Sequence, residues 1–283
     1  MKKAGPIGVF DSGYGGLTVL KALTAQLPEY DYLYLGDNAR VPYGTRSFET
    51  VYQYTLECVE ALFAQGCQLV VLACNTASAK ALRSIQQIDL PKIAPQRRVL
   101  GVIRPTTEEA GLLTQTGHLG VLGTSGTVLS NSYPIEIAKF FPDVVVSQEA
   151  CPMWVPLVEN NEHLGPGADY FLSKHLKALL EKDPAIDAVI LGCTHYPLLQ
   201  SRLEQLSAGK IKFIAQGTIV AQKLELYLQN HPEIAAVCST NGTRQFFTTD
   251  DARIFEEKAR LFYGAAVQAQ HIDLSSISFS ADA

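Results

Sequence analysis

The sequence of 283 residues lacks the long apolar runs of a membrane protein. One of its longest, at 69–74, holds six residues, whereas a membrane-spanning helix needs about 20. Asp11 interrupts the apolar stretch after Lys2 and Lys3, which is not typical of a signal peptide. With 23 basic and 28 acidic side chains the net charge is −5, and no basic block occurs. We therefore expect a soluble cytoplasmic protein without nucleic-acid or membrane partners.

Motifs for metals and nucleotides are also missing. The cysteines at 58, 67, 74, 151, 193 and 238 form no Cys-x-x-Cys pair, and no His-x-x-x-His spacing occurs. The glycine-rich turn at 11–16 is not a dinucleotide fingerprint, because Thr18 stands where the third glycine would fall. No Gly-Lys-Ser or Gly-Lys-Thr loop is present either. We expect a protein that uses neither a metal nor a cofactor.

Short apolar runs alternate with helical patterns along the whole chain. Helical spacing of apolar residues is clear over 17–27, where Pro28 stops it, and over 48–63. The expected strands are 7–10, 32–35, 69–73, 99–103, 119–122, 144–146, 188–191, 211–214 and 235–238. Strands that alternate with helices predict mainly parallel sheets flanked by helices on both faces. The predicted fold class is α/β.

The sequence contains an internal echo. Residues 8–13 resemble 120–125, and residues 69–76 resemble 188–195. In the second pair a cysteine followed by polar residues stands at the same strand end in both copies, which favours two similar domains. We expect a discontinuous first domain of 1–98 and 209–283, a second domain of 99–208, an active site between the two, and a frayed polar tail at 275–283.

The expected strand ends carry the polar residues that could do chemistry, since ligands of parallel sheets bind beyond the carboxyl ends of the strands. A cysteine at a helix start is placed to be a thiolate, and both Cys74 and Cys193 precede helical patterns. His195 follows Cys193 closely enough to share a proton with it. Two thiols on opposite sides of one carbon could move a proton from one face to the other and so invert a stereocentre. The remaining four cysteines are interpreted as packing residues.

Four blocks of the sequence carry a family resemblance. They are FDSGYGGLTVLKAL at 10–23, GDNARVPYG at 36–44, LACNTASA at 72–79 and GCTHYPLL at 192–199. In this order they resemble glutamate racemase, within the aspartate/glutamate racemase superfamily. The resemblance implies two α/β domains and a cofactor-independent two-base racemisation of L-glutamate to D-glutamate. It also implies a supply of D-glutamate for peptidoglycan and, by analogy, a homodimer.

The resemblance also assigns roles to single residues. It implies that Cys74 and Cys193 are the two acid/base thiols, the first acting on the D-isomer and the second on the L-isomer. It makes Asp11 and His195 the auxiliary residues that tune them, and Glu149 the acidic partner of that histidine. The substrate-binding positions that it implies are Asp11, Ser12, Tyr43, Gly44, Asn75, Thr76, Thr124, Thr127, Thr194 and His195.

Three other functions stay open at this point. The protein could racemise another acidic amino acid such as aspartate, or a hydantoin, because selectivity for side-chain length does not follow from these motifs. A Cys–His pair with one nucleophile and one base would instead suit acyl transfer. A non-catalytic amino-acid-binding protein is a third alternative, although a binder needs neither thiol.

Overall fold

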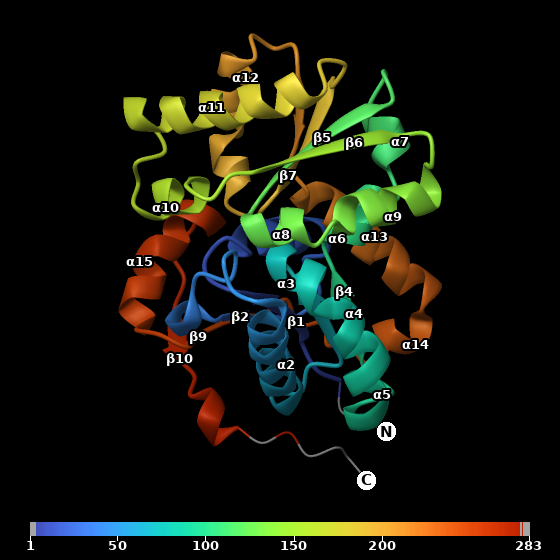
Figure 1. Cartoon of the computed structure of the whole chain (residues 1–283). Helices are drawn as coiled ribbons and strands as arrows, with labels where there is room; N and C mark the ends of the chain where they lie inside the picture. The colour runs from blue at the N-terminus through green and yellow to red at the C-terminus, as the bar shows by residue number, and fades with distance from the viewer. Residues whose placement is uncertain (1–3, 278, 280–283) are drawn as a thin grey trace.

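The computed structural model describes residues 4–277 and 279, and it contains two parallel sheets flanked by helices (Figure 1). The first sheet has the order β10-β9-β2-β1-β3-β4 and the second the order β6-β5-β7-β8. The strands of the first sheet are β1 Ile7–Asp11, β2 Tyr32–Gly36, β3 Leu69–Leu72, β4 Arg98–Gly101, β9 Arg244–Thr248 and β10 Ala269–His271. Those of the second are β5 His118–Gly123, β6 Val145–Ala150, β7 Ala188–Gly192 and β8 Lys212–Ile214. The predicted α/β class is confirmed.

Helices follow most strands, as the alternating pattern predicts. In chain order up to β7 they are α1 Leu17–Gln26, α2 Phe48–Ala64, α3 Asn75–Lys80, α4 Leu82–Ser84, α5 Leu90–Ile93, α6 Ile103–Thr107, α7 Ala110–Leu113, α8 Ser125–Leu129, α9 Ser132–Phe140, α10 Trp154–Glu159 and α11 Pro166–Lys182. After β7 come α12 Gln200–Leu206, α13 Gly217–Asn230, α14 Pro232–Ala235 and α15 Ala252–Tyr263. Short 3₁₀ turns lie at Asn38–Arg40, Tyr196–Leu199 and Leu274–Ser276, and a π-turn at Ile85–Asp89. No helix in the described part of the chain is long and apolar enough to cross a membrane.

The two sheets share one topology. The order β2-β1-β3-β4 in the first recurs as β6-β5-β7-β8 in the second, with all pairs parallel. The echoing segments of the sequence run through the same two strands of each copy, β1 with β5 and β3 with β7. Cys74 and Cys193 therefore follow equivalent strands, each an internal strand of its sheet.

Both predicted crossings between the halves lie one strand too early. β4 pairs with β3, so residues 99–101 belong to the first sheet and not to the second domain. β8 pairs with β7, so residues 212–214 belong to the second sheet and not to the returning first domain. The physical reason is that each β-α-β unit ends with a strand added to its own sheet, and the chain crosses only after that strand.

The C-terminal part of the chain holds the other errors. The predicted strand 235–238 is wrong, because α14 ends at Ala235 and Cys238 makes only an isolated bridge to Gly5. Strands β9 and β10 were not predicted, since both are rich in polar residues and β10 lies at the sheet edge. The expected fraying of 275–283 is wrong for Phe279, whose ring packs against Phe63 with centroids 5.6 Å apart; residues 278 and 280–283 lie outside the described part.

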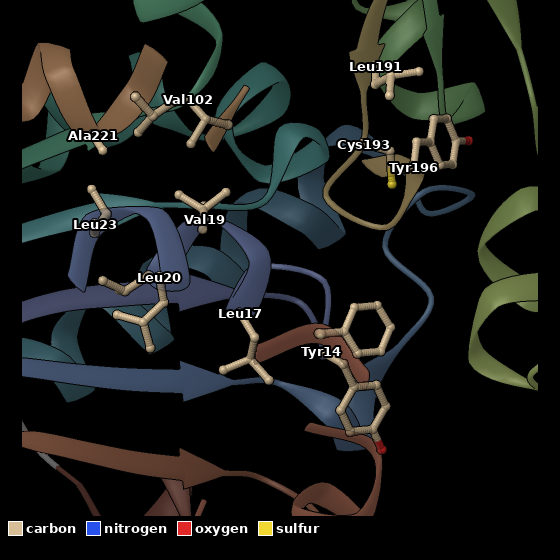
Figure 2. Packing of buried hydrophobic residues seen from close by; sticks show 14 of the residues in the cluster. Tyr14, Leu17, Val19, Leu20, Leu23, Val102, Leu191, Cys193, Tyr196 and Ala221 are labelled. Atoms are coloured by element: carbon tan, nitrogen blue, oxygen red, sulfur yellow. The ribbon is translucent and has the colours of Figure 1, made fainter. Parts of the chain in front are cut away.

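One hydrophobic cluster continues from the first half into the second and fixes how the halves meet. Leu17, Leu20 and Leu23 form the buried stripe of α1, and Figure 2 shows this helix beside Ala221 of α13. The same cluster reaches Cys193 and its neighbours beyond β7. Each such leucine contributes about 1.5–3 kcal/mol when fully buried. Packing of α1 therefore sets the position of the second cysteine relative to the first sheet.

Candidate active site

A cavity of about 410 Å³ lies between the two halves, at the carboxyl ends of the central strands. Both cysteines of the echoing segments line it, together with residues from both halves. Of the predicted site residues, the lining contains Ser12, Tyr43, Gly44, Cys74, Asn75, Thr76, Thr124, Cys193, Thr194 and His195. Asp11 and Thr127 are fully buried behind this lining. The structure thus brings together predicted residues from five separate segments of the sequence, at 11–12, 43–44, 74–76, 124–127 and 193–195.

Cys74 stands between the end of β3 and the first turn of α3. Its Sγ accepts a hydrogen bond from the Ala77 N–H at 3.4 Å and lies 3.5 Å from the Ser12 hydroxyl. Burial, with a further contribution from the charge of Asp11, raises the pKa of Cys74 to about 12 despite these two bonds. Desolvation thus outweighs the helix terminus and favours the neutral thiol of Cys74.

Asp11 lies at the end of β1, between the two cysteine-bearing strand ends. Its Oδ2 accepts a hydrogen bond from the Gly13 N–H at 2.9 Å, and its Oδ1 lies 3.5 Å from the Thr194 hydroxyl. Burial raises the pKa of Asp11, although the positive charge of His195 opposes this. Asp11 therefore links the turn after β1 to the loop that carries Cys193.

Cys193 has a different environment, dominated by His195. The Cys193 Sγ lies 3.9 Å from His195 Nδ1, and His195 Nε2 lies 2.9 Å from Glu159 Oε1. Burial by itself would lower the pKa of His195, but hydrogen bonds with Cys193 and Glu159 outweigh it and raise the pKa to about 10. His195 is therefore protonated at neutral pH and can exchange a proton with the Cys193 sulfur.

Gly15 allows the turn after β1 to approach this histidine closely. A Cβ at Gly15 would lie 2.3 Å from Thr194 Oγ1 and 2.4 Å from His195 Nδ1. The Thr18 hydroxyl adds a hydrogen bond to the Thr194 carbonyl at 3.0 Å. The turn after β1 and the start of α1, both in the first half, thus contact the loop after β7 directly.

The predicted role of Glu149 is wrong. Glu149 lies on the edge strand β6, where its carboxylate is 3.2 Å from His175 Nδ1 and 2.7 Å from Lys182 Nζ, both on α11. These hydrogen bonds outweigh burial and lower the pKa of Glu149. The partner of His195 is instead Glu159, the last residue of α10, which also lines the cavity. In the sequence, Glu159 is marked only as an acidic residue at the end of an apolar helical stretch. This pattern does not reveal that α10 folds back over the site.

Cys151 was interpreted as a packing residue, yet it also lines the cavity. It is fully buried, and its Sγ lies 3.7 Å from the Glu149 carbonyl. Burial, with the charges of Glu149 and Cys193 adding to it, raises the pKa of the Cys151 thiol well above its usual range. In the described part of the chain this sulfur forms no hydrogen bond with a histidine or a hydroxyl, whereas Cys193 has His195.

Hydroxyl and amide groups form the polar wall of the cavity. Thr76 Oγ1 lies 2.9 Å from Thr124 Oγ1, and Thr124 Oγ1 lies 3.1 Å from Thr127 Oγ1. These hydroxyls come from the first turns of α3 and α8 and can donate to a carboxylate. The Asn75 Oδ1 accepts a hydrogen bond from the Tyr133 hydroxyl at 2.7 Å, which leaves its amide N–H groups as donors. The wall therefore suits a small anion.

Tyr43 and Gly44 line the cavity through the loop after the cis Val41–Pro42 bond. The Tyr43 hydroxyl donates to the Asp37 carboxylate and is therefore directed away from a substrate. The Gly44 carbonyl accepts a hydrogen bond from the Gly126 N–H of α8 at 2.8 Å. If these two residues contact a substrate as predicted, they do so through backbone atoms other than the Gly44 carbonyl.

Comparisons with known proteins agree with this geometry. Residues 7–224 match the Asp/Glu/Hydantoin racemase family. A glutamate racemase from Oceanobacillus iheyensis is 38% identical over 96% of this chain and 94% of its own length. One from Streptococcus gordonii is 39% identical over 95% and 98%.

Solved structures show the same similarity. A glutamate racemase isoform from Bacillus anthracis superposes with a TM-score of 0.87 at 35% identity, over 96% of this chain and 98% of that one. The Francisella tularensis glutamate racemase, solved in complex with D-glutamate, gives a TM-score of 0.85 at 30% identity, over 97% and 99%. The chain therefore belongs to the Asp/Glu/Hydantoin racemase family, a family of isomerases, and its resemblance to glutamate racemases is confirmed.

Proposed function

We propose that this protein interconverts L- and D-glutamate without a cofactor, using Cys74 and Cys193 as its two acid/base groups. The observation that carries the proposal is that these two thiols follow equivalent strands of two similar sheets and line one cavity. The similar Francisella protein, crystallised with D-glutamate, supports the choice of substrate. A cavity of about 410 Å³ is a suitable size for a small amino acid.

The protonation states suggest how each direction starts. In the L-to-D direction, Cys193 removes the α-proton of L-glutamate, and the Cys74 thiol delivers its own proton to the opposite face of the α-carbon. The L-to-D step leaves Cys74 as the thiolate and Cys193 as the thiol. The D-to-L direction starts from that state: Cys74 removes the α-proton of D-glutamate, and the Cys193 thiol delivers its proton to the opposite face. Burial and Asp11 favour return of a proton to Cys74, with a pKa of about 12, and protonated His195 can donate its proton to the Cys193 thiolate. Asp11 and Glu159 act through these groups and are positioning residues.

The main chemical difficulty is the weak acidity of the α-carbon. As its proton leaves, negative charge develops on the α-carboxylate. The threonine hydroxyls and the Asn75 amide are already oriented to donate there, which stabilises that charge without reorganisation. Enclosure between the two halves excludes water and strengthens these interactions. Fixed placement of the α-carbon between two sulfurs supplies the proximity contribution.

The test is exchange of the α-hydrogen of glutamate in D₂O, followed by proton NMR, together with circular dichroism to follow inversion. We expect both L- and D-glutamate to lose the α-proton signal and to converge on the racemate. L-aspartate and L-glutamine serve as comparison substrates. Exchange with aspartate and none with glutamate would favour a racemase of another acidic amino acid. No exchange with any of them would favour a binding protein.

The acyl-transfer alternative makes a different demand on the site. It needs one nucleophile and one base, which Cys193 and His195 could supply, but it leaves Cys74 without a role. Such an enzyme would accumulate a thioester on Cys193, which intact-mass measurement with substrate would detect. We expect no added mass.

The cellular role follows from the product. D-glutamate made in the cytoplasm would supply peptidoglycan synthesis, and depletion of the protein should stop growth unless D-glutamate is added. We also propose that the protein is a homodimer, by analogy with its family. Light scattering during size-exclusion chromatography should give twice the chain mass of 30.8 kDa.

A further inference from the structure

Lys80, the last residue of α3, is a buried cation without an acidic partner. Its side chain is only 9% exposed, and it forms no salt bridge with any residue in the described part of the chain. Burial alone lowers the pKa of Lys80. A charge held in this way is costly, so the contacts that fix it need an explanation.

Lys80 contacts residues that follow cavity-lining residues directly in the chain, Arg46 after Thr45 and Gly126 after Ser125. Its Nζ donates a hydrogen bond to the Arg46 carbonyl at 2.6 Å and lies 4.9 Å from the centre of the Phe48 ring. Its stem packs against Gly126 of α8, where a Cβ would lie 2.9 Å from both Cε and Nζ. Lys80 therefore touches the loop before α2 and the first turn of α8 at the same time.

These two segments are the ones that bring the halves together at the substrate wall. The loop carries Tyr43, Gly44 and Thr45 into the cavity lining, and its Gly44 carbonyl accepts the Gly126 N–H at 2.8 Å. Thr76, one turn before Lys80 on α3, meets Thr124 of α8 at 2.9 Å between the hydroxyls. Among the residues that the structure describes, no lysine or arginine lines the cavity itself. The ammonium of Lys80 is thus a positive charge one helical turn behind hydroxyls that suit a carboxylate.

We propose that Lys80 is a positioning residue for the racemisation: by joining the Arg46 carbonyl to Gly126 it holds the loop 43–46 and α8 in place, so that the threonine wall is set to receive a substrate carboxylate. This inference rests on the proposed function. It concerns binding more than proton transfer, because Lys80 touches neither sulfur. The Lys80→Met variant keeps the stem and removes the ammonium, so its effect should fall mainly on KM.

The experiment measures kcat and KM for L- and D-glutamate in the wild type, Lys80→Met and a matched control. Lys92→Met is the control, since it removes an equal charge from an exposed position on α5. For Lys80→Met we expect KM to rise about tenfold in both directions, because the variant loses a charge-assisted hydrogen bond. We expect kcat to change less than about threefold. Lys92→Met should keep the wild-type KM.

A second measurement reports on the loop directly. Hydrogen exchange of the Gly126 amide should become faster in Lys80→Met, because its bond to the Gly44 carbonyl loses its support. An unchanged KM would overturn the proposal, whether or not the melting temperature falls, since a merely structural role predicts that result. If Lys80→Met does not fold, Lys80→Gln decides, with an intermediate rise in KM expected; failure of both variants to fold would leave Lys80 a structural role only and overturn the proposal.

The wild type separates this inference from the proposed function. A wild type that does not turn over glutamate refutes the proposed function. A wild type that does, together with a Lys80→Met variant of unchanged KM, refutes the role of Lys80 alone.

Discussion

The ends of β3 and β7 occupy equivalent positions in two similar sheets, yet they surround their cysteines with different groups. Beyond β3, Cys74 has the Ser12 hydroxyl, the Ala77 N–H and the charge of Asp11. Beyond β7, Cys193 has His195, held on its far side by Glu159. The sheet topology thus determines the position of each sulfur, whereas the side chains around each cysteine determine which group carries the proton.

This asymmetry matters because the proposed reaction is nearly symmetric. A racemase must accept a proton on one face and deliver one on the other in both directions. Two identical cysteine environments would give both thiols the same protonation state. One proton on Cys74 and another on His195 place groups of different protonation on the two faces of the substrate α-carbon. Removal of either group should therefore affect the L-to-D and D-to-L rates unequally.

The largest expected effect comes from removing one of the two thiols. Cys74→Ala should lower racemisation by about a thousandfold or more without unfolding the protein, since a general acid–base group contributes about 10²–10⁴ in rate. Cys193→Ser should impair the two directions unequally. Circular dichroism at saturating L- and D-glutamate measures both rates.

Cys238→Ala is the matched control for these variants. It removes a thiol that is as buried as Cys74, at 4% against 5% exposure, from outside the cavity. Normal turnover in Cys74→Ala would remove this residue from the mechanism. Equal modest losses in both directions for Cys193→Ser would argue against one thiol per face.

A smaller effect on the racemisation rate should distinguish the roles of the side chains Glu159 and Glu149. Glu159→Gln removes the charge that holds His195 protonated and should lower activity about tenfold, more strongly from L-glutamate than from D-glutamate. Glu149→Gln should leave both rates unchanged, because its contacts are with His175 and Lys182 on α11. The reverse ranking in steady-state rates would restore Glu149 as the partner.

The smallest expected effect is on stability as a function of pH. The pKa of His195 rises from 6.5 to about 10 in the folded protein. A raised pKa stabilises the fold fully below pH 6.5, and this contribution declines from pH 6.5 to 10 and is lost above it. Glu159→Gln should thus lower Tm by about 2 °C at pH 6.5 and less toward pH 10. A Tm difference that stays constant over this range would contradict the raised pKa.

The fold class and the cavity residues at the strand ends could be predicted because they depend on local patterns. Apolar runs that end in Cys74 or Cys193 mark buried central strands, and parallel strands bring their ends to one edge. Strands β9 and β10 could not be found in the same way, because polar residues dominate both, and β10 at the sheet edge has no buried residue.

The partner of His195 could not be predicted for a related reason. Glu149 and Glu159 are both acids near the end of an element, and the sequence does not reveal which one faces the cavity. That depends on how α10 folds back over the site after the edge strand β6. Likewise, the helix terminus that follows Cys74 in the pattern favours a thiolate, whereas burial and Asp11, which only the fold reveals, raise its pKa.

The most direct test of the two-thiol account places each single-cysteine variant in D₂O with one enantiomer at a time and follows the α-proton by NMR. We expect Cys74→Ala to exchange the α-hydrogen of L-glutamate only and Cys193→Ala that of D-glutamate only, with no inversion in either case. Exchange of both enantiomers by one variant, or inversion by either, would contradict the placement of one thiol on each face of the substrate carbon.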